Sequence, residues 1–269
     1  VNAEAQALTA QDTHALSSER TDLTHLPFVT IDSANTRDID DALYAEALSE
    51  GWTLWVAIAD PAALIAPDSA LDRAAQQRTT SVYLPDQVIP MLPAELSEQL
   101  CSLQEGENRL AMVAELKVLE DGSIDQIHIH NALIRSHAKL SYQQMAAFLD
   151  GESNAIAAEL QGPAVHLDGC ARALAEWRQK NCLLMDDRPD YKLVTDEKGK
   201  VKEIVRIERN QAHRLVEECM LACNRSIADW LAEKGSGFFI EHAGVRNERK
   251  GEVAALLKEH LPLEQKPSL

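Results

Sequence analysis

Four aspartates that follow one short apolar run constrain this chain more than any other feature. Residues 27–31 are rich in β-forming side chains, and Asp32, Asp38, Asp40 and Asp41 come within the next ten positions. Carboxylates this close repel one another, and each raises the pKa of its neighbours unless a cation neutralises them. A fold that gathers these side chains therefore has to compensate their charge.

A bound metal ion is the simplest compensation for such a cluster. Oxygen-only ligands select a hard ion, Mg²⁺ or Mn²⁺, which can also bind phosphate oxygens. Ile39 lies between Asp38 and Asp40, and an apolar run precedes Asp32, so we expect the segment to be partly buried. The pattern predicts that Asp32, Asp38, Asp40 and Asp41 are metal ligands, and it favours phosphoryl transfer as the chemistry.

Three other interpretations of the segment can be checked against the residues at its individual positions. A calcium EF-hand loop counted from Asp32 would need an oxygen ligand at Ala34, a glycine at Arg37 and a glutamate at Leu43, and it fails at all three positions. A phosphatase with a nucleophilic aspartate at the strand end would carry a second aspartate at Ala34; this is disfavoured but stays open. An acidic surface loop without a metal also stays open.

The rest of the chain indicates a mixture of strands and helices without internal repeats. Apolar or alternating runs predict strands at residues 27–31, 54–59, 113–118 and 124–134, the last two joined by a Glu-Asp-Gly turn at 120–122. Helical patterns occur at residues 70–77, 141–149, 155–179 and 211–234, with a break expected at Gly162-Pro163. We therefore predict an α/β fold, with an α+β mixed sheet flanked by helices.

Domain organisation and compartment follow from composition. Residues 1–22 show little periodicity, which predicts a linker or the remnant of a preceding domain, with one folded domain over residues 23–269. The apolar runs are too short to span a bilayer and no secretion signal is present, so we expect a cytoplasmic protein without membrane association. Five cysteines form no CxxC pair, and we expect buried thiols.

Six blocks of sequence, in order along the chain, resemble the catalytic RNB domain of the ribonuclease II family. The blocks are FVTIDSANTRDIDDAL (28–43), VAIADP (56–61), YLPDQVIPMLPAELSEQLCSL (83–103), AKLSY (138–142), DRPDY (187–191) and RLVEECMLACN (214–224). The resemblance implies a 3′→5′ exoribonuclease that hydrolyses single-stranded RNA with a metal-activated water and releases nucleoside 5′-monophosphates.

The resemblance also implies roles for the aspartates. Asp32 and Asp41 would hold a Mg²⁺, with Mn²⁺ as a possible substitute, that also contacts the scissile phosphate. Asp38 and Asp40 would complete the site, either on a second metal or by orienting the attacking water. Which aspartate acts as a base stays open.

Four further positions carry over from the family's pattern. Tyr83 matches a tyrosine near the terminal phosphodiester, and we expect it to act in catalysis. Tyr142 and Glu217 match residues that contact ribose and help to distinguish RNA from DNA. Met185 stands where the family has an aromatic residue that stacks on the terminal bases, and its lack of a π-face predicts weaker clamping of the RNA 3′ end.

The family's pattern extends beyond these 269 residues. A TSPIRRY-like motif, whose arginine contacts the scissile phosphate in the family, does not occur here, and we expect the chain to be the N-terminal part of an RNB-type catalytic domain. Flanking OB-type or cold-shock-type domains would supply basic RNA-binding surfaces, which the net charge of −17 argues against in this chain.

Alternative functions remain at this point. The chain could be an inactive fragment of the enzyme, or a non-catalytic RNA-binding or regulatory relative that keeps the fold. A metal-dependent phosphatase or endonuclease built on the same acidic cluster is a third interpretation. Progressive shortening of RNA from its 3′ end would distinguish the exoribonuclease from all of these.

Overall fold

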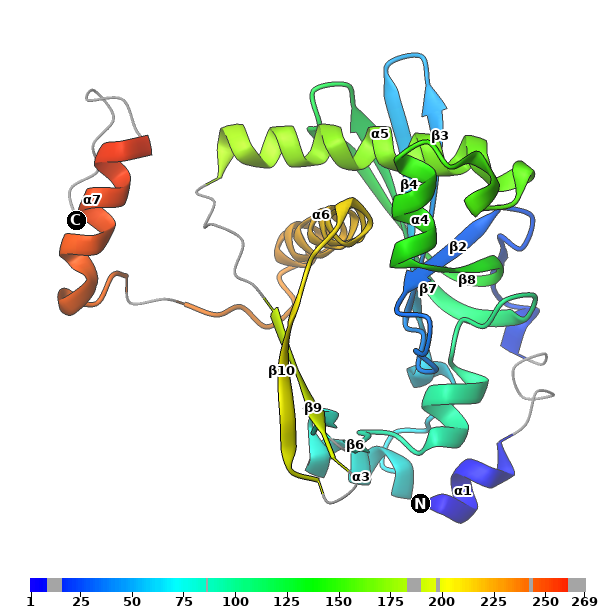
Figure 1. Cartoon of the computed structure of the whole chain (residues 1–269). Helices are drawn as coiled ribbons and strands as arrows, with labels where there is room; N and C mark the ends of the chain where they lie inside the picture. Colours follow the sequence, from blue (N-terminus) through cyan, green and yellow to red (C-terminus); the bar gives the residue numbers. More distant parts are fainter. Residues whose placement is uncertain (9–15, 86, 183–189, 197–198, 242–243, 261–269) are drawn as a thin grey trace. The chain divides into compact units, whose positions relative to one another are not determined.

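The computed structural model describes residues 1–8, 16–85, 87–182, 190–196, 199–241 and 244–260 (Figure 1). The chain forms two compact units, Val1–Trp230 and Leu231–Leu269. The second unit contains the short turn η4 (Asn247–Arg249) and helix α7 (Lys250–His260). None of the helices in the described ranges combines the length and apolar character needed to cross a bilayer.

The first unit is built on a six-stranded mixed sheet with the order β1-β8-β2-β3-β4-β7. Its strands are β1 (Thr21–Asp22), β2 (Phe28–Asp32), β3 (Asp41–Leu48), β4 (Gly51–Ala59), β7 (Asn108–Leu119) and β8 (Ile124–Ser141). Strand β8 is parallel to β1 and β2, and all other neighbours are antiparallel. The predicted mixed sheet flanked by helices is confirmed.

Strand β8 is the longest strand of the sheet and joins its two ends. It pairs with β7 from Ile124 to Arg135 and with β2 from Ser136 to Ser141. The pairings therefore run from β8 through β2, β3, β4 and β7 and return to β8. This closure explains why β8 continues beyond the expected end at residue 134.

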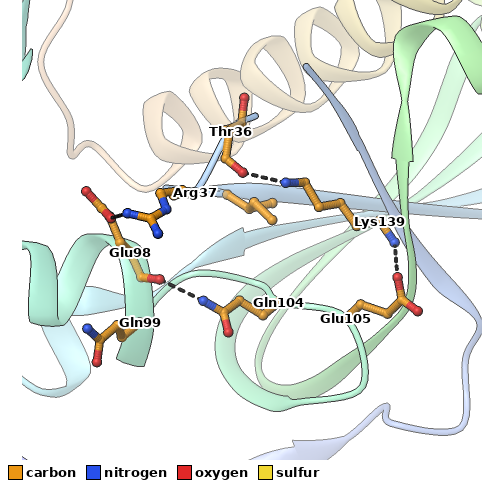
Figure 2. A pocket seen from close by; sticks show the side chains of 8 residues that line it. Thr36, Arg37, Glu98, Gln99, Gln104, Glu105 and Lys139 are labelled. Atoms are coloured by element: carbon orange, nitrogen blue, oxygen red, sulfur yellow. Dashed lines mark hydrogen bonds and ion pairs between the residues drawn. The ribbon is translucent and has the colours of Figure 1, made fainter. Parts of the chain in front are cut away.

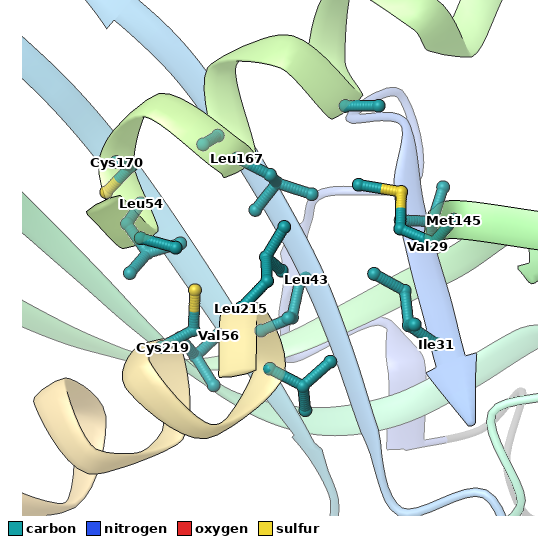
Figure 3. Close-up of a cluster of buried hydrophobic side chains, with 14 of the residues drawn as sticks. Val29, Ile31, Leu43, Leu54, Val56, Met145, Leu167, Cys170, Leu215 and Cys219 are labelled. Carbon is teal, nitrogen blue, oxygen red and sulfur yellow. The ribbon is translucent and has the colours of Figure 1, made fainter. Parts of the chain in front are cut away.

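One face of the sheet packs against helices and forms the larger core (Figure 3). Alternate residues of β3 and β4, among them Leu43, Leu54 and Val56, meet Leu167 of α5 and Leu215 of α6. Because side chains alternate across a strand, the residues between them supply the opposite face. There Phe28, Tyr44 and Trp55 form a second core, in which Tyr44 stacks on Trp55 with 5.0 Å between ring centroids.

Four of the helices that begin in the first unit match predicted patterns, whereas α1 was not predicted and one expected break is absent. They are α1 (Asn2–Ala7), α3 (Ala70–Arg78), α4 (Tyr142–Leu149), α5 (Ala158–Asn181) and α6 (Gln211–Glu233), with the 3₁₀ turns η1 (Pro61–Ala63) and η3 (Ser153–Ala155) and the π-helix η2 (Glu95–Leu100). Helix α5 continues through Pro163, so the expected break is wrong. Leu160 and Ala164 on either side of the proline are buried in the core, and this packing holds the helix together.

Residues expected to form a linker at the start of the chain contain ordered elements. Ala5 of α1 is buried with Leu71 of α3 and Leu96 of η2. Arg20 forms a partly buried ion pair with Asp60, with 2.6 Å between Nη2 and Oδ2, and β1 pairs with β8. The described residues before Leu23 therefore pack within the first unit.

Four other features were not expected from the sequence. Strand β3 and the two-stranded sheets β5 (Val82–Tyr83) with β6 (Val88–Ile89) and β9 (Asp190–Thr195) with β10 (Val201–Ile207) had no predicted counterparts. Cys182 is exposed, whereas the other four cysteines are buried as expected. The Glu-Asp-Gly turn is confirmed, and Gly122 is required there because its φ is +80° and an added Cβ would lie 2.0 Å from the Ala173 carbonyl oxygen.

Candidate active site

Asp32 and Asp41 lie at the same end of two paired strands. Strand β2 ends at Asp32, and β3 begins at Asp41 after the connecting segment 33–40, here called the aspartate loop. The strands are antiparallel with Val29 opposite Leu43. Antiparallel pairing therefore brings the end of β2 next to the start of β3, and the loop between them carries Asp38 and Asp40.

Hydrogen bonds hold backbone groups of the aspartate loop at several points. The Ile39 N–H donates to Oγ of Ser102 over 3.2 Å, and the same hydroxyl donates to the Arg37 carbonyl over 2.7 Å. The Asp40 carbonyl accepts from the Ala59 N–H at 2.8 Å. Ile39 and Ser102 are both buried, as expected from the apolar residue between two aspartates. Ile39 therefore anchors the loop in the protein, although most other residues of the loop are exposed, and the interpretation as an acidic surface loop stays open.

Burial and repulsion by neighbouring aspartates raise the pKa values of Asp40 and Asp41. Burial raises the pKa of Asp41 to about 6, and the charges of Asp32 and Asp40 add to the shift. The Asp40 side chain keeps an exposed surface, yet loss of hydration raises its pKa, with further contributions from Asp38 and Asp32. The charges of Asp32 and Asp38 therefore act on Asp40, and those of Asp32 and Asp40 act on Asp41, in addition to the larger effect of burial.

The cluster fits a divalent ion in its chemistry, but its side chains are not gathered around one point. Carboxylate oxygens are the ligands that Mg²⁺ and Mn²⁺ prefer, and a cation would relieve the repulsion that raises the pKa values of Asp40 and Asp41. In the described part of the chain, no three His, Cys, Asp or Glu side chains lie close enough together to hold a metal ion. Three of these carboxylates would have to move closer to share one ion.

Tyr83 extends from the short strand β5 to the aspartate loop. Its hydroxyl donates a hydrogen bond of 3.1 Å to Oδ2 of Asp38. Partial burial and the negative charge of Asp38 raise the pKa of Tyr83, so its proton is retained at neutral pH. The ring itself is 66% exposed and is accessible to a substrate.

Tyr142 lies next to the aspartates because β8 runs beside β2. Asp32 pairs in register with Ser141, and Ser141 caps α4, whose first residue is Tyr142. Burial raises the pKa of Tyr142 to about 12, and the charges of Asp32 and Asp41 contribute to this increase. Tyr142 therefore presents a protonated hydroxyl close to the carboxylates.

Residues in and just before the first turn of helix α6 contact Tyr142. The imidazole of His213 stacks on the Tyr142 ring with 3.8 Å between centroids, and the Asn210 side chain donates to the Tyr142 carbonyl at 3.1 Å. Arg209, whose charge lowers the pKa of Tyr142, forms an ion pair with Glu217. The guanidinium of Arg209 therefore connects Glu217 to the tyrosine.

The structure brings together most of the residues predicted for the site. Direct contacts or electrostatic effects connect Asp32, Asp38, Asp40, Asp41, Tyr83 and Tyr142, and Glu217 joins them through Arg209. Met185 lies outside the described residues, so its role stays a prediction. Ser102, Arg209 and His213 were missed; all three lie in or next to the quoted sequence blocks, but only their long-range contacts reveal a role.

Sequence comparisons identify relatives of this chain. A family model described as the RNB domain matches residues 20–268. Exoribonuclease 2 of Klebsiella pneumoniae is 46% identical over 250 residues, which make up 90% of this chain and 38% of that protein. The chain thus spans well under half the length of the curated relatives that it matches.

Solved structures show the same fold. RNase R of Mycoplasma genitalium, in complex with ribose methylated single-stranded RNA, superposes with a TM-score of 0.85 and 28% identity over 95% of this chain and 40% of that chain. Yeast Ssd1, described as a pseudonuclease, has a TM-score of 0.64 and 17% identity over 84% of this chain and 27% of its own. At that identity the likeness to Ssd1 concerns the fold alone.

Proposed function

Because this chain belongs to the RNB domain family, we propose that the complete protein hydrolyses single-stranded RNA from its 3′ end and releases nucleoside 5′-monophosphates. The observation that carries the proposal is the cluster of Asp32, Asp38, Asp40 and Asp41 at the joint end of β2 and β3, in which burial and neighbouring carboxylates raise the pKa values of Asp40 and Asp41. Such a site is adapted to a cation and to the phosphate that the cation attracts.

Mg²⁺, or Mn²⁺ in its place, would be held by these four aspartates and would neutralise charge that develops on a phosphate during hydrolysis. Residues of the chain would orient the attacking water and hold the substrate. Carboxylate oxygens that do not contact the ion would orient a water molecule towards phosphorus. The Tyr83 hydroxyl, which already donates to Asp38, lies where it can hold the last phosphodiester.

Ribose recognition is assigned to Tyr142 and Glu217. The Tyr142 hydroxyl stays protonated and can donate to a 2′-hydroxyl, while a Glu217 carboxylate oxygen can accept from it. Both side chains lie beside Arg209, so the ribose would approach between the carboxylates and helix α6. We further propose that OB-type or cold-shock-type domains elsewhere in the complete protein guide the RNA, since this chain has a net charge of −17.

The proposal is tested by incubating the complete protein with 5′-labelled single-stranded RNA and Mg²⁺. We expect a ladder of products that shortens from the 3′ end, together with nucleoside 5′-monophosphates in chromatography of the released material. Internal cuts would indicate an endonuclease, and free phosphate a phosphatase. Either result would contradict the proposal.

A non-catalytic RNA-binding relative is the second candidate. One observation favours it: no three acidic or other metal-binding side chains among the described residues converge on one point. The same incubation separates the candidates, because a non-catalytic relative would shift the RNA in a gel without shortening it.

A further inference from the structure

A cavity of about 360 Å³ lies beside the aspartate loop (Figure 2). Thr36, Arg37 and Ile39 of the loop form one wall, and Lys139 of β8 reaches across to them. The charged groups of this cavity already have protein partners; Arg37, for example, pairs with Glu98 at 3.4 Å. Lys139 is therefore one of the residues that hold the loop in place.

The Lys139 ammonium group binds two carbonyls of a single turn. Its Nζ donates to the Ala34 carbonyl at 3.2 Å and to the Thr36 carbonyl, and the turn is closed by a 3.1 Å bond from the Thr36 N–H to the Ser33 carbonyl. Hydrogen bonds from a charged donor are stronger than those between neutral groups. A single lysine thus fixes the part of the loop that immediately follows Asp32.

The position of Lys139 is itself fixed. It pairs in register with Thr30 of β2, and its backbone N–H donates to Oε2 of Glu105 at 2.9 Å. Three residues further along the chain, the same strand leads into Tyr142. The lysine is therefore attached to a rigid element that also positions the tyrosine.

We propose that Lys139 is a positioning residue, which holds the turn at residues 33–36 so that Asp38 and Asp40 stay beside Asp32 and Asp41 and can take up a divalent cation together. The effect is transmitted through the backbone. Burial and the neighbouring aspartates, not Lys139, shift the pKa values of Asp40 and Asp41. Ser102 anchors the loop at Arg37 and Ile39, and Lys139 anchors the segment that joins Asp32 to Asp38, so removal of Lys139 leaves Asp38 and Asp40 attached from one side only.

This inference rests on the proposed function for the role of the carboxylates, but its test includes two measurements that need no activity. In the complete protein, Lys139→Met removes the ammonium group and keeps a chain of similar length, and Lys139→Arg keeps the positive charge and the donors. Lys117→Met is the matched control, because Lys117 lies on the neighbouring strand β7 and pairs with Asp125 at the surface. Circular dichroism checks that each variant is folded.

Amide hydrogen exchange and Mn²⁺ calorimetry are then measured without RNA. For Lys139→Met we expect exchange of the residue 33–36 amides to be about 10-fold faster or more, and Mn²⁺ binding to be about 10-fold weaker, the scale typical for loss of a residue that orients metal ligands. With RNA and Mg²⁺, kcat should fall about 10- to 100-fold while KM changes less than about 3-fold. Lys139→Arg should recover most of each property.

Two results would overturn the inference. In one, exchange and Mn²⁺ affinity of Lys139→Met equal those of Lys117→Met. In the other, KM for RNA rises while exchange stays normal, which would make Lys139 a direct RNA contact. If the wild-type protein does not shorten RNA at all, the proposed function fails, and exchange and Mn²⁺ binding still decide the role of Lys139.

Discussion

The Tyr142 ring stacks on the His213 imidazole with 3.8 Å between centroids and 14° between planes. This contact joins the start of α4 to the first turn of α6, two elements separated by about seventy residues of chain. The tyrosine hydroxyl is thereby held within electrostatic range of Asp32 and Asp41, and we propose that it contacts ribose there.

We predict that Tyr142→Phe reduces discrimination between RNA and DNA. The variant keeps the stacking on His213 and loses only the hydroxyl, so single-stranded RNA should bind about 2- to 10-fold more weakly while DNA binding is unchanged. Affinities for matched RNA and DNA oligonucleotides test this in the absence of divalent ions. Tyr44→Phe, on the opposite face of the sheet, is the control. Equal losses for RNA and DNA would show that the hydroxyl does not read the 2′ position.

Asp40→Asn should stop cleavage without preventing RNA binding. The substitution preserves shape and removes one negative charge from the cluster, so we expect kcat to fall on the order of 100-fold or more. RNA affinity should stay within about 3-fold, because we propose that other domains of the complete protein supply the basic surfaces that bind RNA. Asp125→Asn removes the same charge from the surface and serves as the control. A parallel loss of binding and cleavage would contradict a catalytic role for Asp40.

Asp41 should make the metal-free protein less stable as the pH rises. Its pKa is about 6 in the folded chain and 3.8 as a free side chain, so the folded state binds this proton more tightly. The stabilisation that this bound proton gives to the folded state is complete below a pH of 3.8 and is lost as the pH rises through about 6.

The variant Asp41→Asn cannot ionise and avoids this loss. In EDTA at about pH 8 we expect it to be more stable than wild type by on the order of 1 to 3 kcal/mol, and the difference should shrink towards about pH 5. Urea unfolding at both pH values measures it. A difference that is independent of pH, or a less stable variant at about pH 8, would exclude a raised pKa for Asp41.

Arg20→Met should destabilise the first unit although Arg20 precedes the predicted domain. Both partners of the Arg20–Asp60 pair are nearly buried, with side-chain exposures of 11% and 12%, and the guanidinium also donates to the Ala111 carbonyl at 3.3 Å. Loss of the cation leaves the partly buried Asp60 carboxylate without a countercharge, although it still accepts from the Ala63 N–H, so unfolding should require about 1.5 to 3 kcal/mol less.

Arg172→Met provides the comparison for that variant. Its ion pair with Asp168 joins neighbouring turns of α5, and the Arg172 side chain is 66% exposed, so we expect a change of less than about 1 kcal/mol. Urea unfolding that gives the same small change for both variants would show that Arg20 does not belong to the folded unit.

Local sequence patterns predicted the elements that carry uninterrupted apolar signals. Strand β4 and helix α6 follow such patterns, whereas β3 was missed because Glu46 and the aspartates at its start obscure the apolar alternation. The break expected at Pro163 did not occur because tertiary packing of α5 outweighs the local preference of proline. Segment 2–7 was missed for a related reason, since its helix depends on burial of Ala5 against distant elements.

The site shows the same division between local and long-range information. The aspartates could be identified from their spacing, because the charges that act on one another lie within ten residues. Lys139 and Ser102 could not be given a role, because their contacts with the aspartate loop join residues that are 103 and 63 positions apart in sequence. Only the folded sheet brings these pairs together.

Anomalous diffraction from crystals of the complete protein soaked in Mn²⁺ tests most directly whether the aspartates form a metal site. We expect a peak within bonding distance of oxygen atoms from Asp41 and at least one other of Asp32, Asp38 and Asp40, with the side chains turned inwards relative to this structure. Well-ordered aspartates that face solvent, with no peak among them at a saturating Mn²⁺ concentration, would contradict the account.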